Sequence, residues 1–266
     1  MIKTLVSIEV DLASSRAIRL ACQLGELMNM QIQPVYVKES PPHESVWGAG
    51  WTSRTWEKEM VQQGHAEISE LLTAEQDSCA VLEEPRVIYG DREGELLKIA
   101  QGEEFDIFIE GAHFPWTVSD LYKRLHSKLY QRIPSPVILV RALRKVNHVQ
   151  LLCFDAKGAE TLTNVVQTLW QGCRVPLVLS YPGKDLDKTE AEVLREAVDR
   201  ADGLLTEAGC TVTVRDTLSL TPREDAVETL KDCGLVAIAV ERAVKKDCSE
   251  LQWLSEVKTS SLLAFR

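Results

Sequence analysis

The chain has 266 residues, of which 40 are acidic and 30 are basic, so its formal net charge is −10. Nucleic acids and anionic membrane surfaces bind proteins through basic patches, so this balance disfavours both as partners. No apolar run approaches the roughly 18 residues of a membrane span. Residues Met1 to Thr4 already begin an apolar strand rather than a charged lead into a signal peptide, and we expect a cytoplasmic protein.

Strand-like and helix-like segments alternate along the first half. Apolar strands are predicted at 3–9, 31–37, 86–90, 105–111 and 136–141, and amphipathic helices at 14–24, 53–75, 94–100 and 119–133. The Pro- and Gly-bearing segment 40–51 is predicted to be irregular. Such alternation predicts an α/β fold with a parallel sheet, helices on both of its faces and right-handed crossovers.

The second half repeats this order. Strands are predicted at 148–154, 175–180, 211–215, 234–240 and 261–265, and helices at 158–171, 187–208, 223–231 and 247–256. The opening strand recurs about 146 residues after the first, which places Glu9 and Asp155 at equivalent positions. A repeat of this length indicates a duplicated domain, with boundaries at 1–143 and 147–266.

The end of each half suggests how the halves associate. The closing segments Val137–Val140 and Leu262–Phe265 are apolar, and as exposed sheet edges they would offer unpaired backbone groups to other chains. The joint between the halves is short and basic rather than rich in Gly and Ser. We therefore expect an intramolecular pseudo-dimer, with a further homodimer left open.

Several segments of the first half resemble a known family. They are the Ser-x-x-Ala helix start at 14–17, Tyr89-Gly90-Asp91, the strand 105–111 and the closing 133–141 with its Pro-Ser-Pro-Val. Together they look like a universal stress protein domain, and the repeat makes the chain look like a tandem universal stress protein. The resemblance implies two flavodoxin-like, Rossmann-like doubly wound five-stranded sheets of order 3-2-1-4-5, associated through their fifth strands, and a stress-response role.

The nucleotide motif of that family is degenerate in both halves. Nucleotide-binding members place glycines after the fourth strand and at a helix N-terminus, where backbone amides cradle phosphate. Gly111 is present, but Phe114 stands at the second glycine position and Lys123-Arg124 replaces the Gly-Ser pair. In the second half Glu241 stands where the first glycine belongs. The sequence therefore predicts no ATP binding and no cofactor, with ATP or AMP binding as the alternative.

Some positions of the family's site are nevertheless retained. By resemblance, the candidates for contacting a nucleotide or another ligand are Glu9, Val37, Gly90, Gly111, His113 and Asp155. A second group is aromatic, since Trp47, Trp51 and Trp116 follow the second and fourth strands, which end at the same edge of a doubly wound sheet. These rings are expected to plug the crevice, and an apolar or aromatic ligand pocket is the alternative.

Cysteines and histidines give no metal signature. The seven cysteines show no C-x-x-C spacing and an odd total, so a disulfide framework and a zinc cluster both fit poorly; we expect buried, free cysteines, with a redox role as the alternative. The five histidines are scattered. The resulting hypothesis is a non-catalytic regulatory protein of the stress response that acts through protein partners not identified by the sequence.

Overall fold

The computed structural model of the chain describes residues 1–39, 51–76, 79 and 81–266, and at 51–53, 74 and 76 it describes the backbone only. The strands are β1 (Ile2–Ile8), β2 (Met30–Lys38), β3 (Arg86–Tyr89), β4 (Ile107–Gly111), β5 (Val137–Val140), β6 (Val149–Leu152), β7 (Leu177–Ser180), β8 (Val212–Arg215), β9 (Leu235–Val240) and β10 (Ser260–Phe265). The helices are α1 (Leu12–Leu27), α2 (Trp51–Gln76), α3 (Arg92–Gly102), α4 (Val118–Leu125), α5 (Lys128–Arg132), α6 (Ala156–Leu169), α7 (Lys188–Glu207), α8 (Glu224–Thr229) and α9 (Ser249–Glu256).

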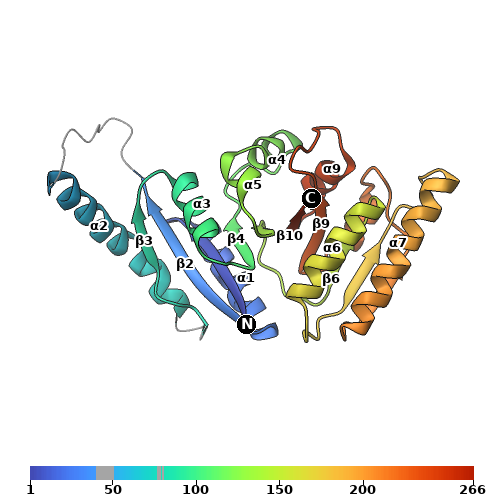
Figure 1. Cartoon of the computed structure of the whole chain (residues 1–266), viewed down its shortest axis with the longest axis horizontal. Coiled ribbons are helices and arrows are strands. Elements are labelled where there is room, and N and C mark those ends of the chain that lie inside the picture. The colour runs from blue at the N-terminus through green and yellow to red at the C-terminus, as the bar shows by residue number, and fades with distance from the viewer. Residues whose placement is uncertain (40–50, 77–78, 80) are drawn as a thin grey trace.

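The ten strands of the described residues form one sheet, in the order β3-β2-β1-β4-β5-β10-β9-β6-β7-β8. Each half therefore has the predicted order 3-2-1-4-5, and the predicted fold class is confirmed. Pairing is parallel within each half, and β5 pairs with β10 antiparallel around Ile138 and Leu262. Figure 1 shows the two halves side by side, with α4, α5 and α9 gathered beside the central strands.

The core lies on both faces of this sheet. Successive strand residues point to opposite faces, so Ile138 and Leu262 join one apolar cluster, while Leu139 and Leu263 join the other. Helices α1, α2, α6 and α7 cover the first cluster, and α3, α4, α5 and α9 cover the second. Each cluster contains residues from both halves, so the core is continuous through the β5–β10 contact.

Two arginines reinforce this contact from opposite sides. Arg141, at the end of β5, donates to the carbonyl of Val257 just after α9. Arg242, just after β9, donates to the carbonyls of Tyr130 and Ile133 in and after α5, both at 2.7 Å. Cations near helix C-termini satisfy carbonyls that have no partner inside the helix. Each half thus caps a helix of the other.

The helix starts correct one prediction. The carboxylate of Asp155 caps α6 by accepting from the Gly158 amide at 2.7 Å, and that of Asp11 caps α1 by accepting from the Ser14 amide at 2.7 Å. The counterpart of Asp155 is therefore Asp11, and the predicted equivalence of Glu9 and Asp155 is wrong. Capping favours the short Asp side chain directly before the helix, and the longer Glu9 lies two residues too early.

The helix predicted at 119–133 is divided. Helix α4 ends at Leu125 and α5 starts at Lys128, because Ser127 has an extended backbone with φ −68° and ψ 159°. The division turns Arg124 and Tyr130 toward the same carboxylate, described below. Within the described residues, no helix is both long and apolar enough to cross a membrane.

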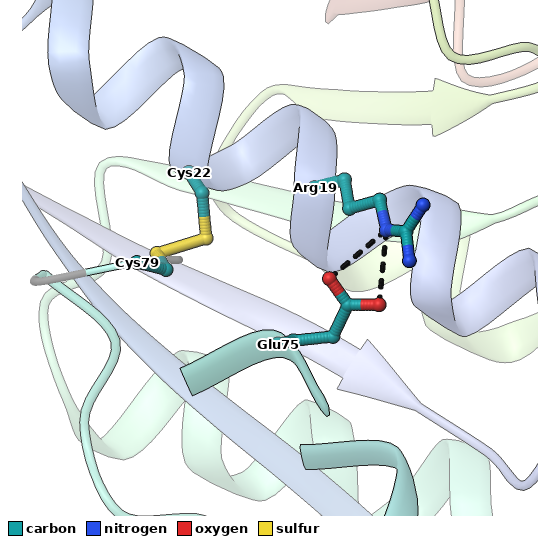
Figure 2. The surroundings of a disulfide bond; sticks show 4 residues. All are labelled: Arg19, Cys22, Glu75 and Cys79. Carbon is teal, nitrogen blue, oxygen red and sulfur yellow. Dashed lines mark hydrogen bonds and ion pairs between the residues drawn. A yellow bond between two sulfur atoms is a disulfide. The ribbon is translucent and has the colours of Figure 1, made fainter. Parts of the chain in front are cut away.

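The cysteine prediction is partly wrong. Cys22 on α1 and Cys79 beyond α2 form a disulfide, with their Cα atoms 5.6 Å apart (Figure 2). The other five cysteines are free, and four of them are buried as expected. Sequence spacing could not reveal the pair, because the two residues are 57 positions apart and meet only through packing of α2 against α1.

Candidate functional site

The candidate site lies at the carboxyl ends of β1 and β4, the point where the strand order of the first half reverses. Ser7 and Glu110 form the last pair of the β1–β4 ladder, and both are buried. Open α/β sheets bind ligands in the crevice outside this point. Here that crevice holds the side chain of Arg92, from the first turn of α3.

Arg92 bridges the two strands and the loop above them. Its Nη2 donates to Glu110 Oε1 at 2.6 Å and to Ser7 Oγ at 2.8 Å, and its Nε lies 2.8 Å from Glu9 Oε1. Only 13% of the side chain is exposed. The N-terminus of α3 is fixed by Asp91, which caps Gly94, so the guanidinium is held over the crevice by local structure as well as by its partners.

Two further side chains complete a cluster around Glu110. Arg124 from α4 pairs with Oε1 of Glu110, and the Tyr130 hydroxyl from α5 donates to Oε2. Burial opposes the ionised carboxylate, but Arg124, Arg92 and these hydrogen bonds lower the pKa of Glu110 to about 2. Burial and the adjacent carboxylate raise the pKa of Tyr130 well above its usual value. Glu110 is therefore an ionised, fully partnered carboxylate at neutral pH.

The net charge of the cluster bears on which ligand it could accept. Its two cations, Arg92 and Arg124, face the carboxylates of Glu9 and Glu110; Glu39 also accepts from the backbone amide of Arg92, and Glu93 lies 4.0 Å from Arg124. The cationic charge is thus already compensated within the chain. A phosphate group entering here would meet excess negative charge rather than a basic pocket.

Gly111 has a packing role in this arrangement. A Cβ at this position would lie 2.2 Å from the carbonyl oxygen of Ala13, so glycine is required where the start of α1 crosses the end of β4. Gly90 has a φ of 156°, and a Cβ there would lie 2.8 Å from Cγ of Glu95; its amide also donates to the carbonyl of Lys38 at 3.1 Å, which joins the ends of β3 and β2. Both glycines therefore have structural explanations that need no ligand.

Two other predicted residues lie apart from the cluster. Val37 is buried on β2, paired with Ile88 of β3, and belongs to the apolar core. His113 is exposed, and its Nδ1 lies 3.3 Å from the carbonyl oxygen of Gly111. Neither interacts with the arginines through any contact found in the described residues, whereas Glu9 does.

The aromatic group is only partly described. Trp47 and the side chain of Trp51 lie outside the described residues, so their predicted meeting with Trp116 stays a prediction. Trp116 donates from Nε1 to the carbonyl of Leu254 on α9, and its ring stacks on Phe114 with centroids 5.6 Å apart. Trp116 and Phe114 therefore contribute to the contact between the halves.

The second half fills its corresponding crevice differently. The last pair of the β6–β9 ladder is Leu152–Ile238, both apolar and buried. Phe154 packs near the fully buried Trp253 of α9, whose Nε1 donates to the carbonyl of Ser219 at 2.8 Å. The cavity left beside Trp253 is about 20 Å³, far smaller than the roughly 300 Å³ of a small-molecule site.

Asp155 also has partners within the chain. Its Oδ1 accepts from Arg266 Nη1 at 2.5 Å, and Arg266 Nη2 lies 3.3 Å from Glu250 of α9. Partial burial opposes ionisation, but Arg266 and the helix cap lower the pKa of Asp155. Glu241 is not at the position of the first glycine, because β9 ends at Val240 before it.

Sequence reasoning missed the two arginines that define the first site. Arg92 follows the Tyr-Gly-Asp turn and looks like an ordinary charge at a helix start, and Lys123-Arg124 was considered as the replacement of the family's Gly-Ser pair. Lys123 is exposed, at 75%, but Arg124 is only 18% exposed. The one available signal was Glu110, an acid inside an apolar strand, which requires a cationic or hydrogen-bonding partner when buried.

Within the described residues, no group of three or more His, Cys, Asp or Glu is arranged to hold a metal ion.

No protein-family model matches the chain, and no curated protein matches its sequence. Solved structures match its fold. A universal stress protein from Archaeoglobus fulgidus DSM 4304 aligns with 99% of this chain and 98% of its own, at 14% identity and a TM-score of 0.64. The chain has the fold of a tandem universal stress protein. A functionally unknown protein from Pseudomonas aeruginosa PAO1 aligns with 99% of this chain and 92% of its own, at 12% identity and a TM-score of 0.56.

A third match covers one half only. A universal stress protein family protein from Arabidopsis thaliana with AMP bound aligns with 52% of this chain and 90% of its own, at 16% identity and a TM-score of 0.34. At these identities the similarity concerns the fold, and function must be argued from the residues of this chain.

Proposed function

We propose that this chain is a non-catalytic, cytoplasmic regulatory protein with the universal stress protein fold, which binds no adenine nucleotide and acts through protein partners. The observation that supports this is the position of Arg92. Its guanidinium occupies the crevice between β1 and β4 and is compensated by Glu9 and Glu110. A nucleotide could enter only by breaking these ion pairs and leaving buried charges without partners.

The neighbouring backbone supports the same proposal. A phosphate cradle needs several amides that no side chain obstructs, yet the second glycine position is Phe114, whose ring is stacked on Trp116. The helix position of the Gly-Ser pair holds Arg124, which is committed to Glu110. Each hydrogen bond lost from a phosphate cradle would weaken binding by about 1.5–3 kcal/mol. In the second half, Leu152 and Ile238 offer no polar group at the corresponding strand ends.

Calorimetric titration of the full chain with ATP and with AMP tests the proposal. We expect no dissociation constant tighter than about 100 μM, which corresponds to about 5.5 kcal/mol of binding. Chromatography of the supernatant after heat denaturation should also release no adenine nucleotide. Tighter binding, or co-purified AMP or ATP, would establish the alternative of a nucleotide-binding module.

The variant Arg92→Ala tests whether Arg92 alone excludes the nucleotide or whether the missing glycines are sufficient. It opens the crevice and leaves Glu9 and Glu110 unneutralised by Arg92, so it too should fail to bind ATP. Arg132→Ala, at an exposed position on α5, is the matched control for loss of one arginine. If Arg92→Ala alone gained affinity, the exclusion would depend on Arg92 rather than on the missing glycines.

A further inference from the structure

The Cys22–Cys79 disulfide joins α1 to the segment that follows α2. Figure 2 shows it beside the ion pair between Arg19 of α1 and Glu75 of α2. Glu75 accepts from Arg19 Nε at 2.9 Å and from Ser15 Oγ at 2.8 Å. The disulfide and this carboxylate are therefore two neighbouring attachments of the C-terminal end of α2 to α1.

Helix α2 contributes little apolar surface of its own to the core. Among its described side chains, only Ile68 and Leu72 are both apolar and buried, although the helix has 26 residues. Burial of two such side chains supplies only about 3–6 kcal/mol, and fixing each backbone residue costs about 1–2 kcal/mol. The Arg19 side chain of the ion pair is 55% exposed, so that pair adds little. Glu67 accepts from Tyr36 and Lys38 of β2 at 2.9 and 2.6 Å, so β2 holds the middle of α2 and the covalent link matters most at its C-terminal end.

The five remaining cysteines are free thiols rather than members of further disulfides. Burial raises the pKa of the thiols of Cys153, Cys233 and Cys248 to about 12. Burial also raises the pKa of Cys173 and Cys210. Because the thiolate is the reactive form, these five thiols exchange poorly. One disulfide beside five free cysteines differs from a secreted disulfide framework, and in a reducing compartment such as the proposed cytoplasm a disulfide is usually transient and redox-sensing.

Access to the two sulfur atoms is unequal. Cys22 is half-buried on α1, whereas Cys79 is only 6% exposed and belongs to the core cluster with Ile68 and Leu72. An external thiolate therefore reaches Sγ of Cys22 more readily than Sγ of Cys79. The leaving group is then the Cys79 thiolate.

We propose that Cys22 and Cys79 form a redox site that a dithiol reductant opens and closes in the folded protein, and that opening it loosens α2 from α1. One thiolate of the reductant attacks Sγ of Cys22, forming a mixed disulfide and releasing the Cys79 thiolate, which takes up a proton. The second thiolate of the reductant then attacks the reductant's first sulfur, which is bonded to Sγ of Cys22 in the mixed disulfide. This releases the Cys22 thiolate, which is also protonated. Two electrons pass to the protein and the reductant leaves as its disulfide.

The site goes beyond the proposed function, because it concerns the outer surface made by α1 and α2 and not the crevice at Arg92. In the closed state the disulfide fixes that surface. In the open state the C-terminal end of α2 is held to α1 through Glu75, while Glu67 still binds Tyr36 and Lys38 of β2. A protein partner that binds α1 and α2 together would therefore distinguish the oxidised from the reduced chain.

The experiment equilibrates the native full-length chain in mixtures of reduced and oxidised dithiothreitol, alkylates free thiols after denaturation, and counts them by intact mass. The expected result is a single two-electron transition at which the count rises by two, with both new labels on Cys22 and Cys79. Hydrogen exchange measured in parallel should become roughly tenfold faster in α2 on reduction, while α6 and α7 stay unchanged.

Two variants serve as controls. Cys22→Ser/Cys79→Ser should show the fast α2 exchange with or without reductant, and Cys248→Ser, which removes the half-buried free thiol, should behave like the unaltered chain. The proposal would be overturned if Cys22 and Cys79 stayed reduced in excess oxidant. It would equally be overturned if the bond were reduced only in denaturant, or if α2 exchanged at the same rate in both states.

Discussion

The two halves share one strand order but fill its central crevice by opposite means. At the end of the β1–β4 ladder the first half places Ser7 and Glu110, within a network of arginines. At the end of the β6–β9 ladder the second half places Leu152 and Ile238. The strand order therefore requires only that the crevice at the carboxyl ends of these strands be filled and that any buried polar group there have a partner.

The two solutions differ in how they fail. Apolar packing around Ile238 loses stability gradually as atoms are removed, because each lost contact is small. The network around Glu110 loses stability abruptly when any one partner is removed, because a buried charge is then left without a counter-charge. The halves should therefore respond very differently to single substitutions and to pH.

The largest expected difference is between Glu110→Gln and Ile238→Val. Glu110→Gln keeps the size of the side chain but removes the charge that compensates Arg92 and Arg124, and should lower the free energy of unfolding by about 3–5 kcal/mol. Ile238→Val, the matched change in the second half, should cost about 0.5–1.5 kcal/mol. Guanidinium denaturation followed by circular dichroism measures both. Equal costs for the two variants would contradict the comparison.

A smaller effect concerns acid. The pKa of Glu110 is lowered from 4.5 to about 2 in the folded chain, so its contribution to stability is complete above about pH 4.5 and is lost as the pH falls toward 2. Lowering the pKa of Glu110 from 4.5 to about 2 corresponds to about 3 kcal/mol, and solvent screens this carboxylate weakly because its side chain is only 2% exposed.

Other carboxylates also titrate in this range, so the acid effect must be measured as a difference. The free energy of unfolding of the unaltered chain should fall toward that of Glu110→Gln between pH 5 and about pH 2.5, whereas the difference between the unaltered chain and Ile238→Val should stay constant. A difference between the unaltered chain and Glu110→Gln that does not change with pH would show that Glu110 is not ionised in the folded state.

The same contrast explains what the sequence could predict. The placement of strands and helices follows from local periodicity and from the repeat, which both halves carry along the chain, whereas the strand order came from the family resemblance. The filling of the crevice is tertiary: Arg92 and Arg124 come from different helices, and only the fold brings them to Glu110. The apolar filling of the second crevice was not predicted, although Leu152 and Ile238 already lie in apolar strand patterns.

Three local features were not predicted correctly from the sequence: a helix break, a disulfide and the counterpart of Asp155. The break at Ser127 was not predicted because 119–133 has helical periodicity throughout, and a single extended residue interrupts it. The Cys22–Cys79 pair depends on how α2 packs, which no pattern in the sequence encodes. The repeat also misled at Glu9, because it matched the acids by their position after the strand rather than by the helix amide that each one caps.

The smallest expected effect comes from converting the first crevice into the second. The triple variant Arg92→Met/Glu110→Leu/Arg124→Met removes the three buried charges of the network at once and leaves only Glu9, whose side chain is 38% exposed, without its arginine. Replacing a buried ion network by apolar side chains of similar length is often neutral or stabilising by about 1–4 kcal/mol. We expect a free energy of unfolding equal to or above that of the unaltered chain, and no acid transition assignable to Glu110. The hydroxyls of Ser7 and Tyr130 lose their charged partners in this variant and must bind water or other groups. Guanidinium denaturation at pH 7 and at pH 3 measures both quantities. A triple variant as unstable as Glu110→Gln would mean that the first half needs its charges to fold, and that the two crevices are not alternative fillings of one topology.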